Sequence, residues 1–185
     1  RKAPLKTSRT ISGNRVGVNS SRMPHSPAVD YLPLEAIHLI DGDEQTCWCS
    51  RSQPQADAAP AWIRLDLPME RPLARIVLRK RPAGAPRNQP GSMPLDHGAV
   101  EVGMAMPAEV EIAVSRDGCA WETVFHGPSD ETPEKREFSY DLGGKRAKQI
   151  RITGHHLARV ENWLFSFSIG AVDVYDEQGR NVALA

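Results

Sequence analysis

Hydrophobic and polar residues alternate with a period of two along much of the chain after residue 60. In residues 61–67, Ile63, Leu65 and Leu67 take one face of an extended segment, while Arg64 and Asp66 take the other. Such alternation is typical of a strand that buries one face. Further strands are predicted over residues 74–79, 109–115, 121–125, 138–142, 149–153 and 164–175. Short alternating strands separated by turn signals, with no sustained helical stripe, predict an all-β sandwich or jelly roll.

Length and composition fit one turn-rich domain. The chain has 185 residues, of which 40% are hydrophobic, 14 are Gly and 15 are Pro, so it has enough apolar material for one core. Its formal net charge is zero, which argues against a nucleic-acid partner bound through broad phosphate neutralisation. No run of 18 apolar residues occurs, so no transmembrane segment is expected.

The N-terminal region differs from the rest in charge. Residues 1–30 carry six basic side chains against one acidic side chain. We therefore expect residues 1–28 to be a basic leader or linker and residues 29–185 to be the β-sandwich domain. Because the sequence begins with Arg1 rather than Met, we also expect it to be a piece of a longer product.

The three cysteines allow at most one disulfide. Cys47 and Cys49 flank Trp48 and would share one face of a strand, which is a poor geometry for bridging each other. Two readings stay open: three small buried side chains, or a disulfide from Cys119 to Cys47 or Cys49.

Two loops are candidates for a working surface. Residues 79–107 are rich in Pro and Gly, and a 29-residue connection in a compact domain is usually functional or disordered. Residues 154–162 are polar and include His155 and His156, which as neighbours would point in opposite directions rather than bind one metal. No nucleophile elbow, phosphate-binding glycine loop or HExxH motif occurs, so the sequence predicts no enzymatic activity.

Oxygen-bearing side chains are densest over residues 39–50. Asp41 and Asp43 stand on either side of a glycine, so a tight turn could aim both carboxylates inward, and Thr46 adds a hydroxyl and a carbonyl. Converging oxygens of this kind suit calcium. Asx turns without an ion are the alternative.

The run Asp41-Gly42-Asp43-x-x-Thr46-x-Trp48-x-Ser50 resembles a motif of the discoidin family, the coagulation factor V/VIII type C domains. Later landmarks agree in order. They are Trp62-Ile63-Arg64-Leu65-Asp66-Leu67, Arg75-Ile76-Val77-Leu78, Val110-x-Ile112-x-Val114-Ser115-x-Asp117-Gly118-x-x-Trp121, Lys148-Gln149-Ile150-Arg151-Ile152 and Ala171-Val172-Asp173-Val174-Tyr175. The resemblance covers roughly residues 29–177 and implies a galactose-binding-like jelly roll of about eight main antiparallel strands.

The resemblance also implies a structural calcium ion. Carried over by position, its ligands are the His38 carbonyl, Asp41, Asp43, both oxygens of Thr46 and the Gly170 carbonyl. The family's usual glutamate is replaced by Ala171, which removes one negative ligand and predicts weaker calcium binding.

Members of the family bind sugars through loops at one rim of the sandwich, with planar polar groups and a stacking aromatic ring. In this chain the rim loops offer Arg51, Arg79, Arg81, Asn88, His155, His156, Asn162 and Trp163. For Trp163 two roles stay open: contact with a sugar, or capping of the sandwich like the other tryptophans. By the same family position, Trp48, Trp62 and Trp121 are expected in the core.

Three functions follow from the resemblance. The first is a non-catalytic carbohydrate-binding module of a larger extracellular or periplasmic protein, whose partners are a mono- or oligosaccharide and the domains of the parent chain. The second is an adhesion domain for proteins or phospholipids. It is suggested by the apolar residues Met93, Leu95, Val100, Val102, Met104 and Met106. The third is a β-domain that braces a catalytic neighbour.

Overall fold

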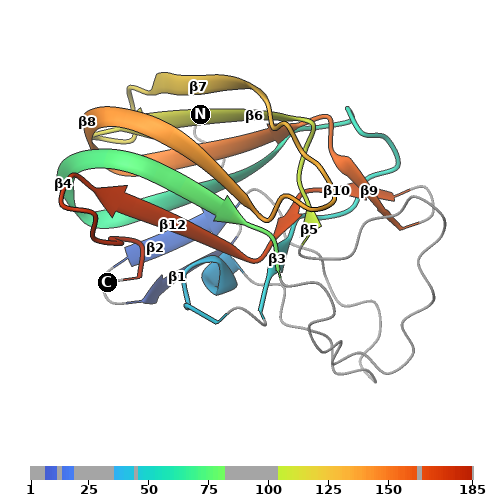
Figure 1. Cartoon of the computed structure of the whole chain (residues 1–185), viewed down its shortest axis with the longest axis horizontal. Coiled ribbons are helices and arrows are strands. Elements are labelled where there is room, and N and C mark those ends of the chain that lie inside the picture. The colour runs from blue at the N-terminus through green and yellow to red at the C-terminus, as the bar shows by residue number, and fades with distance from the viewer. Residues whose placement is uncertain are drawn as a thin grey trace.

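The computed structural model describes residues 7–11, 14–18, 36–43, 46–81, 104–161 and 164–184. These residues form a β-sandwich with one short 3₁₀ helix, η1 (Figure 1). In chain order the elements are β1 (Thr7–Ile11), β2 (Asn14–Val18), η1 (Ala36–Leu39), β3 (Trp48–Cys49), β4 (Ala61–Arg79), β5 (Met104–Ala105), β6 (Glu109–Ser115), β7 (Glu122–Pro128), β8 (Glu137–His155), β9 (Ala158–Glu161), β10 (Leu164–Ser166), β11 (Ser168–Ile169) and β12 (Ala171–Asp176). The all-β jelly-roll prediction is confirmed.

The two longest strands, β4 and β8, pair antiparallel and bend together. Their register shifts across residues 66–71 of β4. Pro68 and Pro72 lie at or next to this stretch and cannot donate ladder hydrogen bonds, while β8 carries Gly143 and Gly144 with φ of 61° and 68° near its own bend. Because both strands turn back, the two ends of β4 and the two ends of β8 return to the same side, at the right of Figure 1.

The strands form one large sheet and two small ones. In the large sheet the strand order is β1-β2-β4-β8-β6-β7, and β12 also pairs with β4. β3, β11 and β5 form a three-stranded sheet, and β9 and β10 form a hairpin. Each long strand therefore contributes to the packing on both sides of the core, which lies inside the bend.

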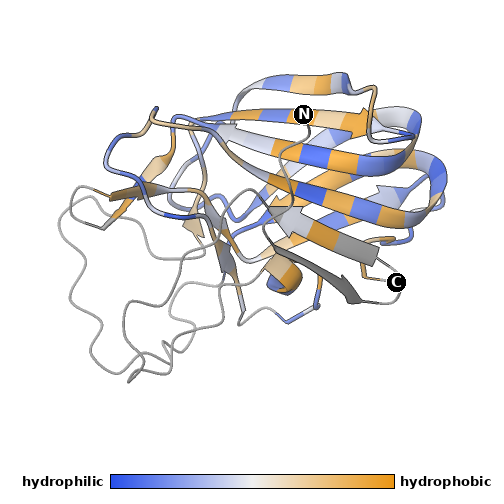
Figure 2. Ribbon diagram, turned by 180° about the vertical axis from the view of Figure 1, so that it is seen from behind, coloured by the Kyte–Doolittle hydropathy of each residue, from blue (hydrophilic) through white to orange (hydrophobic). Residues whose placement is uncertain are grey.

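The period-two pattern decides which side chains enter this core. Ile63, Leu65 and Leu67 are 0–2% exposed, whereas the residues between them are only half-buried. Figure 2 shows the same alternation as hydrophobic and hydrophilic bands along the long strands. The expected inward positions of β6, Val110, Ile112 and Val114, are also buried.

The strands expected from sequence are present, but several are joined. Residues 61–67 and 74–79 are the two arms of β4, and residues 138–142 and 149–153 are the two arms of β8. Residues 164–175 instead divide into β10, β11 and β12. The arms stay continuous because pairing between β4 and β8 resumes on both sides of the bend.

The N-terminal region does not behave as the expected leader. β1 and β2 form an antiparallel hairpin, and β2 pairs with β4 from Arg15 opposite Asp66 to Val18 opposite Ile63. The leader prediction is therefore wrong for residues 7–11 and 14–18, because an open edge of β4 accepts backbone hydrogen bonds from a segment with no marked hydrophobic alternation. The division of the chain at residues 28 and 29 stays a prediction.

The prediction of three core tryptophans is right for only one of them. Trp48 is 0% exposed and meets Phe167 edge to face, with ring centroids 5.4 Å apart. Trp62 and Trp121 are half-buried. Trp62 alternates with the inward-facing Ile63, and the Arg151 guanidinium lies over the Trp121 ring at 4.7 Å.

All three cysteines are free thiols, so the disulfide alternative does not hold in this structure. Cys47 and Cys49 are buried and Cys119 is exposed. Burial raises the pKa of the Cys47 thiol to about 12, despite an opposing effect of Arg81.

We expect a thiol reagent such as dithionitrobenzoate to modify one cysteine per chain in the native protein and three in urea. The reason is that only Cys119 is accessible, and a buried, protonated thiol reacts poorly. The release of thionitrobenzoate at 412 nm measures both numbers. Fewer than three reactive thiols in urea without reductant would instead indicate a disulfide.

The described residues contain no helix longer than the four residues of η1, and none is able to cross a membrane.

Candidate functional site

Two neighbouring cavities open where the ends of the long strands meet the loops. The first, which we call the rim cavity, has a volume of about 370 Å³. The second, the arginine cavity, has a volume of about 230 Å³. Lys80 of the arginine cavity and Glu131 of the rim cavity form an ion pair at 2.8 Å, which places the two cavities side by side.

The rim cavity combines an apolar floor with polar side chains. Met106, Pro128 and Leu157 supply apolar surface. Asp130 and His156 add ionisable groups, and both adopt positive φ, 51° and 50°, in the turns that close this end of the sandwich. Apolar walls with a few placed polar groups are typical of small-ligand sites.

The two adjacent histidines face different surroundings, as their spacing predicts. His156 pairs through Nδ1 with Asp57, and its Nε2 lies 3.6 Å from Glu109. His155 instead lies 3.7 Å from Glu111, and its ring centroid is 5.8 Å from that of His126. Only His156 lines the rim cavity.

In the arginine cavity, Arg79 is held by two carboxylates. Its guanidinium lies 2.9 Å from Glu137 and 3.0 Å from Asp173. Burial raises the pKa of Asp173, while Arg79 and a hydrogen bond from Asn181 act in the opposite direction. The positive charge of Arg79 is thus balanced by two carboxylates of the same chain.

Arg81 lines the same cavity but is 3% exposed. Its Nε and Nη1 atoms are buried and have no hydrogen-bond partner. The backbone of Arg81 is packed against Gly170, where an added Cβ would come within 3.0 Å of the Arg81 nitrogen. Burying a cation with unpartnered donors costs free energy.

The residues predicted to bind sugar do not all meet at one site in the structure. Arg79 and Arg81 share one cavity, His156 lines its neighbour, and His155 and the exposed Arg51 line neither. Asn88, Asn162 and Trp163 lie outside the described residues. The sequence analysis missed Asp130 and Glu131, whose only signal was their place in the short polar turn between two predicted strands.

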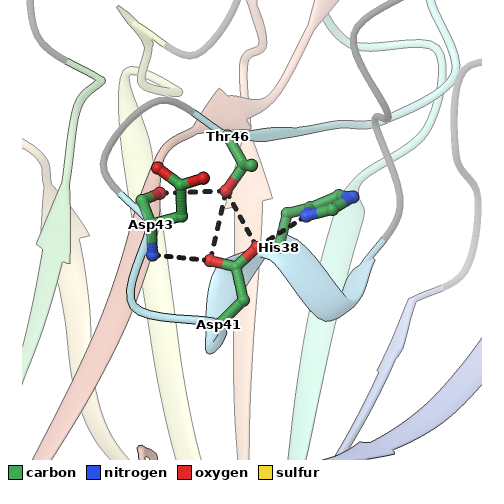
Figure 3. A network of polar contacts seen from close by, with 4 residues as sticks. All are labelled: His38, Asp41, Asp43 and Thr46. Atoms are coloured by element: carbon green, nitrogen blue, oxygen red, sulfur yellow. Dashed lines mark hydrogen bonds and ion pairs between the residues drawn. The ribbon is translucent and has the colours of Figure 1, made fainter.

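The residues predicted to bind calcium converge in part (Figure 3). The Thr46 hydroxyl lies 3.0 and 3.1 Å from the carboxylate oxygens of Asp41 and donates to the Asp43 carbonyl at 2.9 Å. The Asp43 N–H donates to Asp41 at 2.9 Å, and His38 Nδ1 lies 2.6 Å from the same carboxylate. Gly42, with φ of 76°, allows the tight turn.

These residues do not fit a calcium ion as they stand. Both oxygens of Asp41 already lie within hydrogen-bond distance of polar groups of the chain, Oδ1 of the Asp43 N–H and Oδ2 of His38 Nδ1, and Ala171 brings no side-chain oxygen. Within the described ranges, no three His, Cys, Asp or Glu side chains form a group that could hold a metal. Asp43 and Gly170 also line the arginine cavity, where cationic side chains oppose a second cation. Calcium binding stays a prediction from the resemblance.

Known structures share this fold at low sequence identity. A Clostridium perfringens module in complex with GalNAc-β-1,3-galactose matches with a TM-score of 0.60 and 16% identity over 88% of this chain and 94% of that chain. The family 32 module of C. perfringens NanJ, in complex with galactose, matches with 0.59 and 18% over 88% and 93%. The C-terminal domain of a Bacteroides fragilis chitobiase matches with 0.61 and 20% over 95% and 97%.

No curated protein matches the sequence significantly. The family model for F5/F8 type C domains, described as NedA-like, galactose-binding domain, matches residues 38–152. This range includes both arms of β4 and most of β8, and it contributes part of the arginine-cavity lining, including Arg79, Arg81 and Glu137. The chain belongs to the F5/F8 type C family of galactose-binding-like domains.

Proposed function

We propose that this domain is a non-catalytic carbohydrate-binding module that holds a sugar in the rim cavity. The observation that carries the proposal is the composition of this cavity in a galactose-binding-like fold: apolar floor, ionisable rim and a volume of about 370 Å³. The solved relatives in complex with galactose and with GalNAc-β-1,3-galactose support the ligand class.

Each part of the rim cavity suits one part of a pyranose ring. Met106, Pro128 and Leu157 offer apolar contact to the C–H face of the sugar. Asp130 and Glu131 accept hydrogen bonds from hydroxyls, and such bonds to charged acceptors are stronger than neutral ones. His156, whose Nδ1 pairs with Asp57, lines the same cavity and adds a ring nitrogen that can hydrogen-bond a hydroxyl.

The module works as part of a larger carbohydrate-active protein outside the cytoplasm. The B. fragilis relative is itself described as a domain of a chitobiase, which supports this arrangement. In such a protein the module adds affinity for the polymer by raising the effective concentration of substrate near the catalytic domain.

The test is calorimetric titration of the chain with galactose and N-acetylgalactosamine. We expect measurable binding, and we expect His156→Ala to weaken it about tenfold because one oriented hydrogen bond is lost. The matched control is His155→Ala, which removes the adjacent histidine outside the cavity and leaves the affinity unchanged.

Two results would contradict the proposal. If no sugar in a panel of neutral and acidic sugars gave a binding heat in calorimetry or raised the Tm, the carbohydrate-binding proposal would be wrong. Equal losses for His155→Ala and His156→Ala would place the sugar away from the rim cavity, because only one of these side chains lines it.

A further inference from the structure

The Arg81 guanidinium is buried, and it forms no ion pair with the residues that the structure describes. The side chain is 3% exposed, and neither Nε nor Nη1 has a hydrogen-bond partner. Burying a charged group without a partner costs several kcal/mol. An anion that reached this guanidinium would offset part of that cost.

Two of the neighbouring cations, Arg79 and Lys80, already have carboxylate partners. Arg79 pairs with Glu137 and Asp173, and Lys80 pairs with Glu131. Arg81 itself forms no ion pair within the part of the chain that the structure describes.

Two further neighbours of Arg81 bring no negative charge: Arg136 is a cation, and the Cys47 thiol is neutral. Arg136 also lines it and donates from Nη2 to the Arg81 carbonyl oxygen rather than to a carboxylate. Near Arg81 lies the Cys47 thiol, and burial raises its pKa to about 12, so it stays protonated and offers no negative charge. Two exposed acids line the cavity wall: Glu137, which pairs with Arg79, and Asp43.

The backbone holds Arg81 in this position. The Gly170 N–H donates to the Arg79 carbonyl at 2.8 Å, and Gly170 approaches the Arg81 backbone so closely that a Cβ there would lie 3.0 Å from its nitrogen. A pre-positioned, planar guanidinium suits a bidentate oxyanion, because little side-chain freedom remains to be lost on binding.

We propose that the arginine cavity is an oxyanion subsite, in which Arg81 binds the carboxylate or sulfate group of an acidic carbohydrate. The proposal rests on the carbohydrate-binding function and defines its ligand class. The volume of about 230 Å³ accommodates such a compact group, and the ion pair between Lys80 and Glu131 joins this subsite to the rim cavity. The wall formed by Asp43 and Gly170, which the resemblance assigns to a cation, thus borders an anion.

The test compares galactose, galacturonic acid and galactose 6-sulfate by calorimetry with the full chain. We expect at least one acidic sugar to bind about tenfold more tightly than galactose, and 300 mM NaCl to reduce this preference. The two acidic sugars distinguish a carboxylate from a sulfate as the bound group. We expect Arg81→Gln to abolish the preference for the acidic sugar.

The matched control is Arg116→Gln, which removes an exposed arginine of the β6–β7 turn whose side chain is 66% exposed. It keeps the preference for the acidic sugar. Because Arg81→Gln alters a buried side chain, its folding is checked by circular dichroism. Competition by inorganic sulfate in the unaltered chain provides a second measurement that needs no variant: we expect sulfate to displace the acidic sugar but not galactose.

The outcomes separate this proposal from the function on which it rests. Equal affinities for galactose and both acidic sugars would overturn the oxyanion subsite and leave the carbohydrate function standing. Stabilisation by sulfate that depends on Arg81, without binding of any sugar, would support the subsite and overturn the carbohydrate function. A rise in Tm with 5 mM CaCl₂ alone, lost in Asp43→Asn, would overturn the subsite by showing that the cavity wall serves a cation.

Discussion

Replacing Trp48 by alanine is expected to lower the free energy of unfolding by about 3–5 kcal/mol, the range for removing a large aromatic side chain from a core. Trp48 is 0% exposed and packs edge to face on Phe167, at 5.4 Å between ring centroids and an interplanar angle of 85°. Its strand, β3, is only two residues long and pairs with β11 at Ile169, so few backbone contacts compensate for the lost ring.

Urea denaturation followed by tryptophan fluorescence and circular dichroism measures this loss. Trp48→Phe is the matched variant, because it keeps an aromatic ring against Phe167, and we expect it to cost less than half as much. A loss below about 1 kcal/mol for Trp48→Ala would show that the ring does not hold β3 against the core.

The second large effect is expected from adding a single methyl group at Gly154. A Cβ at this position would lie 2.7 Å from Pro107 Cγ and 3.1 Å from Phe167 Cδ1. Neither atom belongs to a flexible side-chain end, so the strand has to move away from its neighbours. Overpacking of this kind costs about 1–3 kcal/mol, and we expect Gly154→Ala to lower the free energy of unfolding by that amount.

Gly127→Ala is the control for Gly154→Ala. Its added Cβ would meet only Phe125 Cζ at 3.5 Å, which is an ordinary contact. Equilibrium unfolding of both variants under one condition gives the comparison, and we expect Gly127→Ala to change the free energy by less than about 1 kcal/mol. Equal stabilities of the two variants would mean that the backbone at Gly154 relaxes without cost.

The strands were predictable because alternation is a local property of the sequence. Ile63, Leu65 and Leu67 show the buried face of β4 without any knowledge of the rest of the chain. The hairpin of β1 and β2 was not predictable in this way, since its place depends on the open edge of β4. The burial of a tryptophan was equally dependent on context: Trp62 has the same side chain as Trp48 but stands on the outward-facing register of its strand.

The sequence predicted the region of the candidate site better than it predicted the individual residues that line it. The resemblance placed Arg79, Arg81 and His156 at one rim, and the structure finds them in two adjacent cavities. Asp130 and Glu131 went unnoticed, because a polar turn between strands is common and its sequence does not say what it faces. Nor did the sequence distinguish Arg79, which has two carboxylate partners, from Arg81, which has none within the described residues.

The sequence by itself determined the class of fold and the family, because alternation and turn signals act over short stretches and the family's motifs are continuous in the chain. Only the tertiary structure decided the chemistry of the site. The bend of β4 and β8 brings the strand ends together, and burial there decides which charges are paired. The fold likewise packs the Arg81 backbone against Gly170 in the cavity that Asp43 lines, a proximity of residues far apart in the sequence.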